Sequence, residues 1–190
     1  MALRTGISIP MGKAEGGSGG DMSNSFAWQV PLFVEIGGKP NRFLFIGGYL
    51  GLGFGGTAGD LQAICSSSGT TCTAISARGG FEIQYHIVPD GTANPWIGYG
   101  IGYESSGVSM TSGGQTGSIS DNGFEFANFM GGIDFRLSRT FGIGPFLSLS
   151  IGQYRKFRSE ILGRATLEGD ITDKATHEWL SAGARFVFFP

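Results

Sequence analysis

The chain has 190 residues, is rich in glycine (35 residues) and aromatic residues (13%), and carries only 15% charged residues. Its net charge of −2 without a basic run excludes a nucleic-acid-binding protein, and the absence of an apolar stretch of about 18 residues excludes a membrane-spanning helix. A chain with so few charges is unusual for a water-soluble protein, and in a membrane it must form a closed β-barrel, where every backbone amide has a partner.

Alternation of apolar and polar residues with a period of two recurs along the chain and predicts eight β-strands. These strands cover residues 2–11, 26–37, 43–55, 74–88, 96–108, 123–137, 143–156 and 177–189. We find no helical periodicity of useful length.

The segments between these strands alternate in length. The short segments, which contain the Pro, Gly, Asn or Asp residues that tight turns require, are 38–42, 89–95 and 138–142. The long segments, rich in Gly, Ser and Thr, are 12–25, 56–73, 109–122 and 157–176. Short periplasmic turns and longer extracellular loops are typical of outer-membrane barrels. We therefore predict an all-β fold, an eight-stranded antiparallel up-and-down transmembrane β-barrel, as one domain over residues 1–190.

The alternation also predicts which face of each strand contacts lipid. In the third strand, one face carries Leu44, Ile46, Leu50, Leu52 and Phe54, and the other carries Phe45, Gly47, Tyr49, Gly51 and Gly53. A sheet face in bulk water would be dense in Lys, Glu, Thr and Gln. The narrow interior of an eight-stranded barrel instead suits small residues. We therefore expect the apolar face to point outward and the glycine-rich face to line the lumen.

Aromatic residues are placed toward both ends of the strands. Those toward the long loops are Trp28, Phe54, Tyr103, Phe124 and Tyr154, and those toward the short turns are Tyr85, Phe135, Phe141 and Phe188. This placement predicts two girdles at the membrane interfaces, with ordinary core aromatics as the alternative.

Several charged residues have the parity of the lumen face, mostly in the periplasmic half of their strands. They are Arg4, Glu35, Glu82, Asp134, Arg136 and Arg185. Unpaired charges in so narrow a lumen would be very costly, so we predict a salt-bridge plug. Two interpretations stay open, a gate and a satisfied structural core, and we favour the second because buried charges generally need such partners.

The last strand contains the segment SAGARFVF, which includes Gly183, Phe186 and Phe188. It resembles the C-terminal signal by which outer-membrane barrels are recognised for insertion, although Phe189 and Pro190 follow here. Over its full length the chain resembles small eight-stranded outer-membrane proteins of the OmpX and OmpA-barrel type. The resemblance implies a Gram-negative bacterial outer membrane, periplasmic termini, the barrel-insertion machinery as a partner, and contact with outer-membrane lipid and lipopolysaccharide.

The first ten residues, MALRTGISIP, lack the charged region and apolar stretch of a secretory signal. We expect a mature or recombinant form with an added Met1, or a chain whose start has been trimmed.

The only two cysteines, Cys65 and Cys72, lie in the second long loop within the segment ICSSSGTTC. An oxidising compartment favours a disulfide between them, with free thiols as the alternative. No histidine or further cysteine lies near them in sequence, so we do not expect a metal site.

The sequence gives little support for catalysis. Lipid A-deacylating barrels of the resembled group carry a serine two residues after a histidine, but His86 and His177 are each followed by other residues. His177, Glu178 and Ser181 do not easily form a hydrolytic set, because adjacent strand residues point to opposite faces. The segment 51–56 matches a dinucleotide fingerprint without the helix that this site requires. We therefore expect no enzymatic activity and no cofactor.

Three functions remain in competition. The leading prediction is an integral outer-membrane barrel with a mostly filled polar lumen and a structural or surface-interaction role, through long loops that meet an unknown extracellular partner. The alternative is a narrow porin-like channel for ions or small solutes, favoured by the glycine-lined interior. A soluble ligand-binding barrel of the lipocalin type would need a charged exterior, which the composition argues against.

Overall fold

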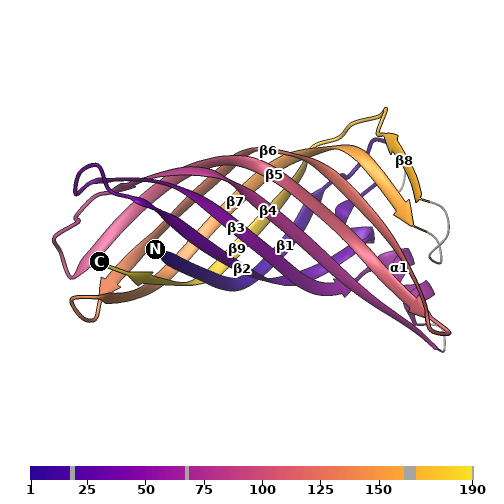
Figure 1. The fold of residues 1–190 in the computed structure, drawn as a ribbon, viewed down its shortest axis with the longest axis horizontal. Coiled ribbons are helices and arrows are strands. Elements are labelled where there is room, and N and C mark those ends of the chain that lie inside the picture. Colours follow the sequence, from indigo (N-terminus) through magenta and orange to yellow (C-terminus); the bar gives the residue numbers. More distant parts are fainter. Residues whose placement is uncertain (18–19, 67–68, 161–165, 190) are drawn as a thin grey trace.

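The computed structural model describes residues 1–17, 20–66, 69–160 and 166–189. Long antiparallel strands form a closed ring, and each pairs with its sequence neighbour around the barrel (Figure 1). The eight strands of the ring are β1 (Ala2–Gly12), β2 (Phe26–Gly38), β3 (Leu44–Thr57), β4 (Thr70–His86), β5 (Ala93–Ser112), β6 (Gln115–Arg136), β7 (Phe141–Glu160) and β9 (His177–Phe188). The predicted eight-stranded up-and-down barrel is therefore confirmed.

The ring closes where β9 pairs with both β1 and β7. Figure 1 shows both termini at the end that carries the three short connections, which we call the short-turn end. The opposite end carries the long connections, and we call it the loop end. Parts of three predicted long loops, residues 18–19, 67–68 and 161–165, lie outside the described residues.

The loop end contains more regular structure than we predicted. It includes a 3-10 helix η1 (Met22–Asn24), a short helix α1 (Gly59–Cys65) and an additional strand β8 (Thr166–Asp170) that pairs with β7. Among the described residues, no helix has the length and apolar character needed to span a membrane.

The prediction that residues 109–122 form a loop is wrong, because β5 and β6 continue through this segment as one long hairpin. The strands turn at Gly113 and Gly114, whose φ angles of 58° and 80° are both positive. A two-residue turn of this kind needs positive φ at both central positions, which glycine adopts without strain. The run of Ser, Thr and Gly residues concealed the alternation that would have indicated strand.

The apolar faces of the strands point outward, as predicted. Leu50 is 71% exposed and Phe81 is 77% exposed, whereas Phe45, Tyr49 and Glu82 are buried. Large exposed apolar residues occur on every strand of the ring, so the outside of the barrel is a continuous apolar band. A patch of this extent marks a surface that contacts lipid or another apolar partner.

The apolar band ends at an aromatic pair on the side of the loops. The rings of Tyr103 and Phe124, both exposed, meet edge to face with centroids 5.5 Å apart. Beyond this pair, outward positions of the β5–β6 hairpin are occupied by small and polar residues such as Ser105 and Asn122. The prediction that Tyr154 belongs to the aromatic girdle is wrong, because this residue is fully buried and stacks on His177 inside the barrel.

Candidate functional site

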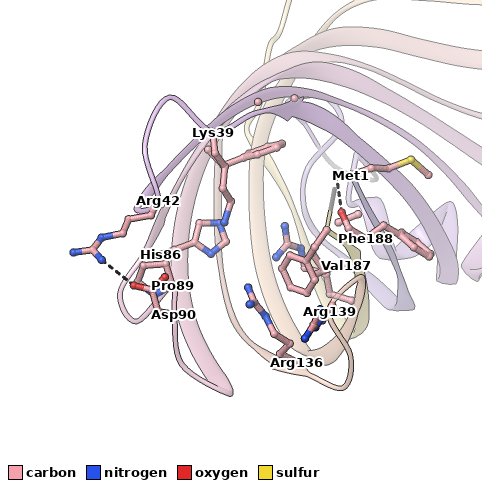
Figure 2. A pocket seen from close by; sticks show the side chains of 16 residues that line it. Met1, Lys39, Arg42, His86, Pro89, Asp90, Arg136, Arg139, Val187 and Phe188 are labelled. Carbon is pink, nitrogen blue, oxygen red and sulfur yellow. Dashed lines mark hydrogen bonds and ion pairs between the residues drawn. The ribbon is translucent and has the colours of Figure 1, made fainter.

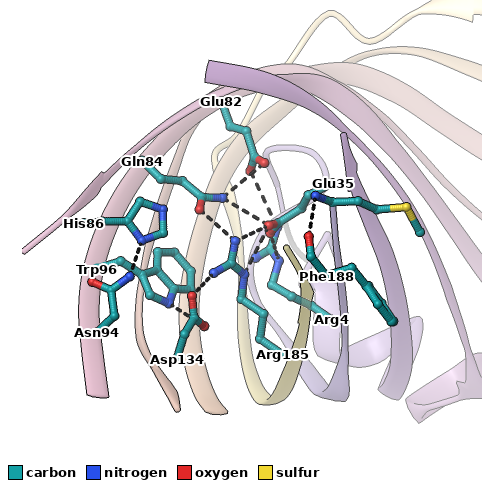
Figure 3. Close-up of polar contacts among 11 residues, drawn as sticks. Arg4, Glu35, Glu82, Gln84, His86, Asn94, Trp96, Asp134, Arg185 and Phe188 are labelled. Carbon is teal, nitrogen blue, oxygen red and sulfur yellow. Dashed lines mark hydrogen bonds and ion pairs between the residues drawn. The ribbon is translucent and has the colours of Figure 1, made fainter. Parts of the chain in front are cut away.

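The centre of the predicted plug is Arg185 on β9 (Figure 3). Its Nη2 lies 2.7 Å from Glu35 Oε2, and its Nη1 lies 2.6 Å from Asp134 Oδ2. The guanidinium carbon is 4.3 Å from the ring centroid of Trp96, whose indole N–H donates to the other oxygen of Asp134 at 3.2 Å. Arg185 is therefore held by two buried carboxylates and one aromatic face, contributed by three other strands.

Arg4 on β1 is the second cation of the plug and lies directly opposite Arg185 in the β1–β9 register. Its Nε is 2.5 Å from Glu35 Oε1, and its Nη2 is 4.0 Å from Glu82 Oε2. The guanidinium carbon also lies 4.9 Å from the centroid of the Phe33 ring. Glu35 thus bridges two arginines that would otherwise repel each other across adjacent strands.

Gln84 on β4 connects the charged members of the plug and was missed by the sequence analysis. Its Nε2 donates to Glu35 at 3.1 Å and to Glu82 at 3.2 Å, while its Oε1 accepts from Arg185 Nη2 at 2.8 Å. A signal was available, because Gln84 has the same inward parity as Glu82. An amide can donate and accept at once, so it links carboxylates to a guanidinium without adding charge.

Arg136 does not join the plug, although its parity predicted that it would. It is the last residue of β6, it is exposed, and its guanidinium lies 4.5 Å from the ring centroid of Phe189. The parity of a residue in the strand predicts which side of the sheet its side chain faces. At the end of a strand, however, the inward side faces the open mouth of the barrel and not the filled lumen. The other five predicted members, Arg4, Glu35, Glu82, Asp134 and Arg185, lie together.

A second polar cluster, closer to the loops, was also missed. Glu104 on β5 is paired with Arg78 Nε at 3.6 Å and with the Nε2 atom of His177, and all three side chains are buried. The hydrolytic set that we considered around His177 does not form, because Ser181 Oγ is instead 2.8 Å from Ser8 Oγ. Arg78 shares the inward parity of Glu82, so the sequence contained a signal for this cluster as well.

Tyr49 lies in the lumen and donates from its hydroxyl to Glu125. Its ring occupies the space that glycines on β4 and β5 leave free. A Cβ atom at Gly102 would lie 2.6 Å from the Tyr49 hydroxyl oxygen, and one at Gly80 would lie 2.8 Å from it. The glycine-rich inner face therefore accommodates large side chains from other strands and does not leave an empty bore.

The loop end of the lumen is covered by an apolar cluster. Its buried members are Met22, Phe26, Ala74, Val108, Tyr154, Ile171 and Trp179. Met22 belongs to η1 and Ile171 to the fourth long connection, so these residues fold over the mouth from outside the barrel wall. We call this cluster the apolar cap.

The predicted disulfide between Cys65 and Cys72 is present, with the Cα atoms 5.6 Å apart. It joins the end of α1 to the beginning of β4. Leu61 of α1 packs against the apolar cap, so the disulfide restrains a segment that contributes to the cap.

The residues of the predicted insertion signal lie on β9. Gly183 pairs with Gly6 of β1, and Phe188 lies on the outer surface with its ring 5.6 Å from that of Phe141. Phe186 has the same outward parity as Phe188 and is half-buried. Their role in insertion remains a prediction.

No family model and no curated protein matches the chain. The solved structures that are similar to the chain include the following three. Neisserial surface protein A is 13% identical, with 99% of this chain and 96% of that one covered and a TM-score of 0.49. The attachment invasion locus protein Ail of Yersinia pestis is 14% identical, with 97% and 96% covered and a TM-score of 0.44. The outer membrane protein AlkL is 14% identical, with 99% and 89% covered and a TM-score of 0.47. At this level of similarity, conclusions about function rest on the chain's own residues.

Proposed function

We propose that the protein is an integral β-barrel of a Gram-negative bacterial outer membrane that acts through its external loops and does not conduct solutes. The observation that carries the proposal is the double closure of the lumen. The ion-paired plug fills the half nearer the short turns, and the apolar cap covers the loop end. Membrane insertion is supported by the exposed apolar band, because such a surface is stable in lipid and not in water.

The plug is a poor path for an ion. Its arginines and carboxylates hold each other in place across several strands. An ion that passed would have to replace these contacts in a narrow space shielded from water, where an unpaired charge costs several kcal/mol by order of magnitude. The apolar cap is a second barrier of different character, because its buried side chains are mostly hydrocarbon and carry no charge.

The long β5–β6 hairpin supports a surface role. It extends well past Tyr103 and Phe124, the aromatic pair that ends the apolar band. Pairing with β4 continues as far as Ser112, and pairing with β7 continues as far as Glu160, so the wall of the barrel projects beyond the band as a sheet. A rigid sheet binds a partner with a smaller loss of conformational entropy than a flexible loop does.

In this orientation the short-turn end faces the periplasm, with both termini, and the hairpin faces the outside. The apolar band contacts outer-membrane lipid, including lipopolysaccharide in the outer leaflet, and the barrel-insertion machinery recognises Gly183, Phe186 and Phe188 on β9. An extracellular partner would bind the part of the β5–β6 hairpin that projects beyond the apolar band.

The surface role is tested by shortening the hairpin. Replacing residues 109–118 with Asn-Gly joins Val108 to Ile119, which already face each other in the register, and keeps Val108 in the apolar cap. The matched control is Gly113→Asn, which keeps the hairpin length and places an Asn-Gly turn at its tip. The measurement is attachment of producing cells to animal-cell monolayers and to glass.

We expect the control variant to attach as the wild type does and the shortened variant to attach at the level of non-producing cells. Equal attachment by wild-type and non-producing cells, or by wild-type and shortened variants, would contradict the surface role. Surface display is checked separately with an epitope in the first long connection.

A further inference from the structure

A cavity of about 470 Å³ opens at the short-turn end of the barrel (Figure 2). Charged side chains from each of the three short connections line it, namely Lys39 and Arg42 after β2, Asp90 after β4, and Arg139 after β6. Arg185 of the plug also contributes to its wall. The cavity is therefore continuous with the plug on one side and open to solvent on the other.

Among the described residues that line this cavity, positive charges outnumber negative ones. Arg42 and Asp90 pair with each other at 2.9 Å. Across residues 1–17, 20–66, 69–160 and 166–189, neither Lys39, Arg136 nor Arg139 forms an ion pair within 4.0 Å. This surplus is local, because the whole chain has a net charge of −2.

The positive charges around Lys39 make its protonated form less stable. Partial burial lowers the pKa of Lys39, and repulsion from Arg185 and Arg136 lowers it further, while Asp134 opposes this effect. A bound anion would remove the repulsion. The protein therefore holds an ammonium group in a place where a negatively charged ligand would stabilise it.

The donor groups suit the oxygens of a phosphate. Two guanidinium groups offer planar pairs of N–H donors, which match phosphate and carboxylate oxygens, and the ammonium adds a compact point charge. The face of Phe189 against Arg136 restricts that side chain, so less freedom is lost when it binds. Phe188 and Phe189 also line the cavity, which places apolar surface beside the cations.

We propose that this cavity binds a phosphate group, with Lys39, Arg136 and Arg139 as its ligands. The phosphate can come from the headgroup of a phospholipid in the adjacent leaflet or from a free phosphate in solution. The site is separate from the hairpin surface, so it does not depend on the proposed surface role.

The test is a calorimetric titration of the full chain, refolded in octyl glucoside, a detergent without phosphate. The probes are inorganic phosphate and dihexanoylphosphatidylglycerol, and dihexanoylphosphatidylcholine reports the effect of net headgroup charge. The test variant is Lys39→Gln/Arg136→Gln/Arg139→Gln. The matched control is Lys13→Gln/Lys156→Gln/Lys174→Gln, which removes three positive charges from the loop end. A heat-sensitive gel shift verifies that each variant is folded.

We expect the affinity for a phosphate probe to fall at least about tenfold in the test variant and to stay unchanged in the control. Binding of both inorganic phosphate and the anionic lipid would show that a free phosphate is sufficient, and binding of the anionic lipid alone would identify a headgroup. The proposal is overturned if neither probe binds the wild type, or if the test variant binds as tightly as the wild type.

Discussion

The two halves of the lumen are closed by different chemistry. Near the short turns, charged side chains from five strands bind one another around Arg185 and Glu35. At the loop end, an apolar cap closes the mouth with residues such as Met22 and Ile171 that belong to the connections. The first closure is built from the barrel wall alone, whereas the second adds residues of the connections to residues of the wall. A change in one half should therefore have a different consequence from a change in the other.

The largest effect is expected from Glu35→Ala. This change removes the carboxylate shared by Arg4 and Arg185 and leaves two buried guanidinium groups opposite each other. Loss of one partner from a buried ion pair costs about 3–5 kcal/mol. Urea unfolding in lipid vesicles measures this change. Asp90→Ala is the control, because its pair with Arg42 is largely exposed and such pairs are worth about 0–1 kcal/mol. Equal losses in the two variants would contradict the role of Glu35.

A smaller effect of another kind is expected from Ile171→Ala in the apolar cap. Removal of a buried aliphatic side chain costs about 2–5 kcal/mol, and we expect the lower end of this range because a loop can relax. The result should be faster protease cleavage of the connections at the loop end while the gel shift of the barrel is retained. Leu167→Ala, an exposed residue on β8, is the control. An unchanged cleavage rate for Ile171→Ala would mean that the cap does not hold the connections.

Removal of the disulfide should loosen the segment around α1 at the loop end without changing the stability of the barrel. A closed loop of this length stabilises a folded segment by roughly 2 kcal/mol through the entropy of the open chain. In Cys65→Ser/Cys72→Ser, we expect faster cleavage around α1 and no change in the urea midpoint of the barrel. A lower midpoint would show that the two halves are more strongly coupled than the structure indicates.

The smallest effect concerns pH at the short-turn end. The pKa of Lys39 is lowered by burial first and by Arg185 and Arg136 next. Because the folded state then loses its proton before the unfolded state does, stability rises with pH between the two pKa values. Arg136→Gln should raise the pKa of Lys39 and reduce this rise, as followed by NMR of labelled lysine. An unchanged or lower pKa in the variant would contradict the positive character of the cavity.

The alternation of side chains was sufficient to predict the ring of strands and its orientation. It placed Leu50 and Leu52 outside and Glu35 and Glu82 inside, because a strand residue has only two sides to face. Alternation carries no information on how far along the barrel a side chain lies. For that reason Arg136 was assigned to the plug, although the end of β6 places it at the open mouth.

Structure that depends on contacts between distant segments could not be predicted in the same way. The apolar cap combines Met22, Val108 and Ile171, which have no common periodicity and meet only when the connections fold over the mouth. The inward parity of Arg78 and Glu104 predicts that both side chains face the lumen. That they lie opposite each other follows from the register of the β4–β5 pairing. Their partnership could be predicted only after that pairing was known.

The closed lumen is tested most directly by single-channel current in a planar bilayer, with protein whose refolding is verified by its heat-sensitive gel shift. The account predicts no discrete conductance steps for the wild type, because the plug and the apolar cap obstruct the lumen in series. Discrete steps in the wild type, changed in size by Glu35→Ala, would contradict it and would identify the protein as a narrow channel.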